Sequence, residues 1–93
     1  MNQAILFSDN EYYNATLQQI EFQAQCEGAL ITCVISVKYL YQLNDSPDQS
    51  SNIDEQAVLD YFESVRFDIE DIAEKMIHEQ KFNEDGKVYI KRT

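Results

Sequence analysis

The feature that most constrains this chain is an apolar stripe that runs through residues 53–82. Its members recur at alternating steps of four and three: Val58, Phe62, Val65, Ile69, Ile72 and Met76. This spacing places them along one side of a helix and leaves acidic residues on the other side. A helix with one apolar side needs a surface to cover, so the rest of the chain is expected to supply a sheet.

The stripe is continuous, yet two residues favour a break into two helices. Phe67 would lie on the acidic side of a continuous helix. Asp68 is a residue type that commonly caps the start of a helix. The sequence therefore predicts helices over roughly residues 53–65 and 69–81, separated by a break at residues 66–68.

Before this region, apolar and polar residues alternate with a period of two. This pattern is typical of a strand with one face exposed to solvent. The alternation is interrupted by Glu27-Gly28, and a two-residue turn there predicts a β-hairpin. Glu before Gly is not the preferred turn pair, so a four-residue turn, which keeps the same faces, stays open as an alternative. In this register eight small or apolar side chains share one face, as a buried face requires. The predicted pairs are Cys26 with Ala29, Ala24 with Ile31, Phe22 with Cys33 and Ile20 with Ile35.

Shorter elements flank the hairpin. The apolar run at residues 4–7 predicts a short edge strand or an extended arm, and Tyr12 and Tyr13 are expected in a polar loop. Ser36 follows the hairpin and is expected to cap a short helix over residues 37–43.

The last element is a strand over residues 87–91, in which Val88 and Ile90 face inward. The predicted fold class is α+β. A small antiparallel sheet, made of the N-terminal β-hairpin plus the C-terminal strand, has two to three helices packed on one face. The 93 residues are expected to form a single domain over residues 1–93.

The net charge of −10 argues against a general phosphate-binding surface, so no direct contact with nucleic acid is expected. No apolar run has the length of a membrane span, and residues 1–20 lack the pattern of a signal peptide. These observations predict a cytoplasmic protein without membrane association. Cys26 and Cys33 are expected to be thiols, because the predicted register separates them by roughly 13 Å along the ladder.

The sequence predicts no catalytic residue, no cofactor and no metal ion. His78, the one histidine, lies four residues after Glu74 and with it offers at most half a metal site. A solvated surface histidine is the favoured interpretation.

Acidity is the strongest compositional signal, since residues 54–85 hold eleven acidic and three basic residues. A solvated helix face is the favoured interpretation; the others are a docking surface for a basic protein, a mimic of nucleic-acid charge and a divalent-ion site. Tyrosines commonly mark interfaces. The candidate interaction surface combines both signals in Tyr39, Tyr41, Tyr89, Asp60, Glu63, Arg66, Glu70 and Glu74.

Three segments together carry a family resemblance. They are Met1-Asn2-Gln3-Ala4-Ile5 with Phe7 and Asp9, then Phe22-x-Ala24 … Gly28 … Cys33-x-Ile35-Ser36, and last Phe62-x-x-x-Arg66-Phe67-Asp68-Ile69-Glu70-x-x-Ala73-x-x-x-Ile77. In combination they resemble the short YrdB-like bacterial proteins, a family known as a domain of unknown function. The resemblance implies a bacterial cytoplasmic protein with a compact α+β fold, and it implies no activity, cofactor or catalytic residue.

The leading functional hypothesis is a small non-enzymatic interaction or regulatory protein, because no constellation of nucleophile, base and oxyanion donors is evident. Its expected partner is a second copy in a homodimer or a basic protein. Two alternatives stay open. One is a small-ligand or metal-dependent enzyme that uses acidic residues with His78 or Arg66, and the other is an acidic mimic that binds a basic nucleic-acid-binding protein.

Overall fold

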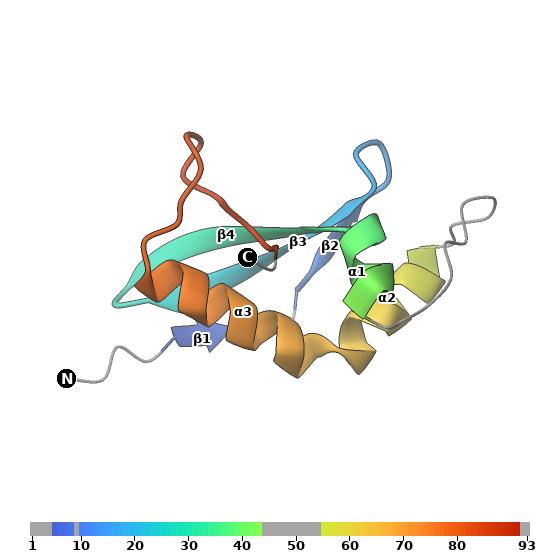
Figure 1. Ribbon diagram of the computed structural model, residues 1–93, viewed down its shortest axis with the longest axis horizontal. Coiled ribbons are helices and arrows are strands. Elements are labelled where there is room, and N and C mark those ends of the chain that lie inside the picture. Colours follow the sequence, from blue (N-terminus) through green and yellow to red (C-terminus); the bar gives the residue numbers. More distant parts are fainter. Residues whose placement is uncertain (1–4, 9, 44–54, 92–93) are drawn as a thin grey trace.

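The computed structural model describes residues 5–8, 10–43 and 55–91. Its elements, in chain order, are β1 (Ile5–Phe7), β2 (Tyr12–Asn14), β3 (Gln19–Cys26), β4 (Ala29–Ser36), α1 (Val37–Leu43), α2 (Glu55–Ser64), α3 (Arg66–His78) and β5 (Val88–Tyr89). The strands join in one five-stranded sheet, and the helices of this part of the chain lie against one of its faces (Figure 1). The predicted α+β fold is confirmed.

The β3–β4 hairpin has the register that the alternation predicts, from Cys26 opposite Ala29 to Ile20 opposite Ile35. Its turn is the two-residue turn at Glu27-Gly28, with φ angles of 52° and 84°. Two positive φ angles are what a two-residue hairpin turn needs to match the twist of its strands. Gly28 adopts this conformation without steric cost because it has no Cβ atom.

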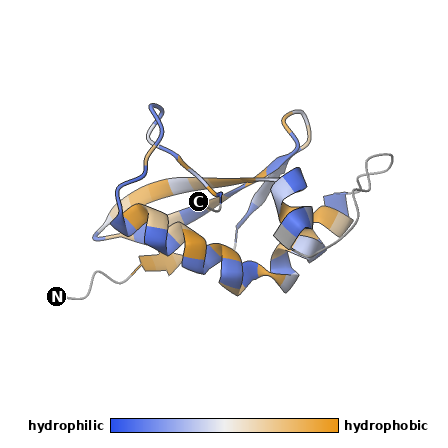
Figure 2. Ribbon diagram, viewed as in Figure 1, coloured by the Kyte–Doolittle hydropathy of each residue, from blue (hydrophilic) through white to orange (hydrophobic). Residues whose placement is uncertain are grey.

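The core lies between this hairpin and the helices. Its buried side chains alternate along β3 and recur at helical spacing along α2 and α3. Along β4, by contrast, three consecutive residues are buried: Cys33, Val34 and Ile35. The largest of them are Phe22, Phe62, Ile20, Ile35, Leu40 and Ile69. Phe22 and Phe62 join the two layers directly, with ring centroids 5.3 Å apart. Figure 2 shows hydrophobic residues along β1 and β4 and an alternation of hydrophobic and hydrophilic residues along α3.

The C-terminal strand differs from the prediction in its direction. β5 pairs with β4 in parallel, with Val88 beside Cys33 and Tyr89 beside Val34, so the sheet is mixed rather than antiparallel. The chain reaches β5 from β4 through the helices, and a crossover of this kind returns the chain to the end of the sheet at which β4 began. Val88 and Ile90 are both buried, as predicted.

The N-terminal region also differs from the prediction. β1 is the predicted edge strand, but Tyr12 and Tyr13 belong to strand β2 and not to a polar loop. β1 pairs with the C-terminal half of β3, and β2 pairs with its N-terminal half. The eight-residue edge of β3 carries backbone groups that need partners, and two short strands supply them in turn.

The helical region does break into two helices, but earlier than predicted. α2 ends at Ser64, Val65 forms the junction, and α3 begins at Arg66. Asp68 lies in the first turn of α3 and is not its cap, since Val65 holds the cap position without a side-chain hydrogen bond. By contrast, Ser36 caps α1 as predicted: its Oγ accepts a hydrogen bond of 3.1 Å from the backbone N–H of Tyr39. Among the described residues no helix is long and apolar enough to cross a membrane.

Candidate functional site

A cluster of charges surrounds Arg66 at the junction of α2 and α3. The Nη2 atom of Arg66 lies 2.7 Å from Oε1 of Glu11 and 3.0 Å from Oε1 of Glu63. Its Nη1 atom lies 3.5 Å from Oε2 of Glu70. The guanidinium carbon sits 5.0 Å from the centroid of the Phe62 ring, within the range of a cation–π contact. The Arg66 side chain therefore ties the β1–β2 connection to both helices.

The environment of Arg66 suits a structural role. Its side chain is 12% exposed, and that of Glu11 is 17% exposed. Burial by itself lowers the pKa of Arg66, but the hydrogen bonds to Glu63 and Glu11 outweigh it and hold this pKa above its ordinary range. The guanidinium stays charged and its donors are directed at carboxylates of the same chain. Because these donors are engaged within the chain, the Arg66 guanidinium is not available to bind an external anion.

Glu11 is the member of this cluster that sequence reasoning missed. It lies 55 residues before Arg66 in the chain. A pair so distant leaves no periodic signal, and Glu11 lies outside the acid-rich stretch that drew attention to the other carboxylates.

The outer side of α2 and α3 carries the other candidate acids. We name this surface the acidic face and define it by five exposed residues: Asp60, Glu63, Phe67, Asp71 and Glu74. Phe67 is 79% exposed, the highest exposure of any large hydrophobic residue in the described part of the chain. At helical spacing its neighbours include Glu63, Glu70 and Asp71. The structure thus places an aromatic ring among carboxylates on a solvent-facing surface.

The three candidate tyrosines do not gather on one surface. The ring of Tyr41 is buried and packs edge to face against Tyr61 of α2, with centroids 4.9 Å apart. Tyr39 is half-buried in α1, and its hydroxyl has no hydrogen-bond partner among the described residues. Both rings help to join α1 to the core.

Tyr89 lies on β5, away from α1, and its hydroxyl donates a hydrogen bond of 2.8 Å to Oδ2 of Asp85. This hydrogen bond raises the pKa of Tyr89. The backbone N–H of Lys87 and the hydroxyl of Tyr89 together lower the pKa of Asp85. The three residues close the turn before β5.

Glu74 and His78 both lie exposed on α3, one turn apart. Twelve residues separate His78 from Arg66, which along a helix is roughly 18 Å, so the two do not converge on one site. Within the described ranges, His, Cys, Asp and Glu side chains form no group of three or more that could hold a metal ion.

The two cysteines are free thiols in different environments. Cys33 is fully buried on the inner face of β4, and burial raises the pKa of its thiol to about 12. Cys26 is half-buried at the end of β3. Because the thiolate is the reactive form, Cys33 is expected to be inert.

Thiol labelling tests this difference. In a Cys26→Ala variant we expect Cys33 to remain unlabelled by a thiol reagent between about pH 7 and 9, below its raised pKa, and to react fully once denaturant is added. The matched Cys33→Ala variant, which keeps the half-buried Cys26, should react without denaturant. Rapid labelling of native Cys33 would contradict the burial of this residue.

The fold and this surface define the class: a small α+β protein with an acidic helical face and a charge cluster that locks its helices together. The chain belongs to the family described as "Protein of unknown function (DUF1488)", whose model matches residues 5–90. This confirms the resemblance to the YrdB-like proteins.

Relatives match over nearly the full chain. "Uncharacterized protein YrdB" of Escherichia coli (strain K12) is 35% identical over 92 residues, which cover 97% of this chain and 99% of the relative. The protein of the same name from Shigella flexneri is 34% identical, with the same coverage. A crystal structure of a DUF1488 protein of unknown function from Shewanella loihica PV-4 is 38% identical and superimposes with a TM-score of 0.85, over 99% of this chain and 97% of that one.

Proposed function

We propose that this protein is a non-enzymatic interaction or regulatory protein of the bacterial cytoplasm, and that its acidic face binds a basic surface of another protein. The observation that carries this proposal is the exposure of Phe67 among carboxylates. Phe67 is the most exposed large hydrophobic side chain among the described residues, and it lies among exposed acids of α2 and α3. Aromatic residues at the centre of a contact commonly supply much of the binding energy.

Charge supports the same partner. The chain has a net charge of −10, and the acidic face carries four exposed carboxylates. A basic protein is drawn to such a surface and oriented by it, whereas nucleic acid is repelled. Arg66 and Glu70 are engaged in ion pairs at the junction, so they hold the face in shape. Phe67 and the exposed acids around it are therefore the residues expected to contact the partner.

The proposal predicts a specific effect of Phe67. A tagged wild-type protein is expected to capture one basic protein from an Escherichia coli lysate, and Phe67→Ala is expected to weaken its binding at least about tenfold. Binding should also weaken as salt rises from about 50 to about 300 mM, because screening reduces the attraction of opposite charges. The measurement is titration of the purified pair by calorimetry.

Phe82→Ala is the matched control, because Phe82 is an exposed Phe outside the acidic face. It is expected to bind like the wild type. Equal binding by the Phe67→Ala variant, or a partner whose affinity does not respond to salt, would contradict the proposal.

A further inference from the structure

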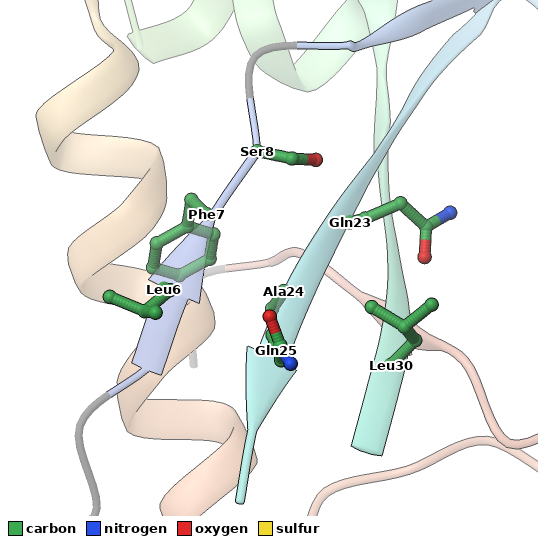
Figure 3. A pocket seen from close by; sticks show the side chains of 7 residues that line it. All are labelled: Leu6, Phe7, Ser8, Gln23, Ala24, Gln25 and Leu30. Atoms are coloured by element: carbon green, nitrogen blue, oxygen red, sulfur yellow. The ribbon is translucent and has the colours of Figure 1, made fainter. Parts of the chain in front are cut away.

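The face of the sheet opposite the helices carries a second exposed apolar feature, separate from the acidic face. Side chains alternate along each strand, so Leu6 of β1, Gln25 of β3 and Leu30 of β4 lie in one row across this outer face. Leu6 is 66% exposed and Leu30 is 73% exposed. The two leucines stand on either side of Gln25 (Figure 3).

A hollow lies beside these leucines. Its volume is about 160 Å³, and it is lined by Leu6, Phe7, Ser8, Gln23, Ala24, Gln25 and Leu30 (Figure 3). Small-molecule and cofactor sites usually measure roughly 300–1,000 Å³, so this hollow is too small for one. It has the size to receive a single side chain of another protein.

Ser8 adds an unsatisfied polar group to the hollow. Its Oγ atom is buried and has no hydrogen-bond partner among the described residues. A buried hydroxyl without a partner costs free energy. By contrast, the carboxamide of Gln23 is already held by the hydroxyl of Thr32, at 3.2 Å.

The charge of this surface limits what can cover it. None of the residues that line the hollow is charged, whereas the whole chain has a net charge of −10. Two copies of such an acidic molecule repel each other over most of their surfaces. They approach most easily where the surface carries no charge, as in the lining of this hollow.

We propose that the outer face at Leu6 and Leu30 is the contact between two copies of this chain. A two-fold axis brings the same patch of each copy together, so one patch must supply both the projection and the recess. This patch has both, since two exposed leucines stand next to a hollow that one side chain fills. The exposed carboxamide of Gln25 in each copy is then within the interface.

This contact differs from pairing along a sheet edge. β1 is at the edge of the sheet, whereas Leu30 belongs to β4, which is separated from β1 by β3. A dimer that joined β1 strands edge to edge would not need Leu30. The contact is also independent of the proposed binding of a basic protein, because it uses the opposite face of the molecule.

Sedimentation equilibrium of the full chain tests the proposal. Over about 5 to 500 µM the wild type is expected to approach twice its chain mass of 10.9 kDa. Leu30→Lys and Leu6→Lys are each expected to raise the dissociation constant of the dimer at least about tenfold. Leu17→Lys is the matched control, because Leu17 is 63% exposed in the turn between β2 and β3, away from the hollow, and its variant should dimerise like the wild type.

Salt gives a second readout. Raising the salt from about 50 to about 500 mM should strengthen this dimer, because screening reduces the repulsion between two acidic molecules. A wild type that stays monomeric over this range of concentration and salt would overturn the proposal. A dimer that survives both lysine substitutions, or one that Leu17→Lys disrupts equally, would also overturn it.

Discussion

Replacing Phe62 by Ala is expected to lower the free energy of unfolding by about 3–5 kcal/mol. Phe62 is fully buried, and its ring lies 5.3 Å from that of Phe22 across the interface between helix and sheet. The Arg66 guanidinium lies over the same ring, at 5.0 Å. The substitution therefore opens a cavity at the centre of the core and removes the support beneath the charge cluster. Urea unfolding followed by circular dichroism measures the loss.

Phe67→Ala is the matched control for this prediction. The same residue type is removed five positions further along, but Phe67 is 79% exposed, so the change in stability is expected to stay within about 0.5 kcal/mol. A loss below about 1 kcal/mol for Phe62→Ala, or an equal loss for both variants, would contradict the assignment of the core.

Local rules account for the elements that the sequence predicted well. The register of the β3–β4 hairpin follows from alternation together with a two-residue turn, because a slip by one residue would turn the apolar set toward solvent. The cap at Ser36 follows from side-chain chemistry, since a hydroxyl at this position satisfies a free N–H of the first helical turn.

Strand direction and edge pairing depended on information that local patterns do not hold. The alternation around Val88 marks a buried strand, but it is the same for a parallel and an antiparallel neighbour. The direction of β5 follows from the path of the chain through the helices. In the same way, Tyr12 and Tyr13 became a strand because the long edge of β3 had backbone groups to satisfy.

The same distinction between local patterns and tertiary contacts applies to the candidate surfaces. The exposure of Asp60, Glu63 and Glu74 could be read from helical spacing. The ion pair between Arg66 and Glu11 could not be predicted in this way, because it requires the β1–β2 connection to fold back on the helix junction. The hollow beside Ser8 was equally hidden, since it forms where β1 pairs with β3. Sequence patterns thus predicted which residues of a single element are exposed, whereas the contacts between elements could be identified only from the tertiary structure.

Replacing Arg66 by Met is expected to lower the free energy of unfolding by about 2–3 kcal/mol. Methionine keeps much of the apolar contact with Phe62 but leaves the largely buried carboxylates of Glu11 and Glu70 without a cation. Removal of one partner from a fully buried ion pair costs about 3–5 kcal/mol, and the exposure of Glu63 reduces the figure here. Thermal and urea unfolding at neutral pH measure the effect.

The Arg66→Met/Glu11→Gln double variant separates the charge effect from simple loss of packing. If unpaired carboxylates cause the loss, the neutral amide at position 11 should restore part of it, and the double variant should be more stable than Arg66→Met alone. If the loss comes from packing, Glu11→Gln should add nothing to the Arg66→Met variant or should lower its stability further. Glu79→Gln is the control for the general effect of reducing the negative charge, because Glu79 is exposed and lies beyond the end of α3, far from the junction. Equal rescue by Glu79→Gln would show that Arg66 only offsets the overall charge of the chain, and would contradict its role as the group that fastens the β1–β2 connection to the two helices.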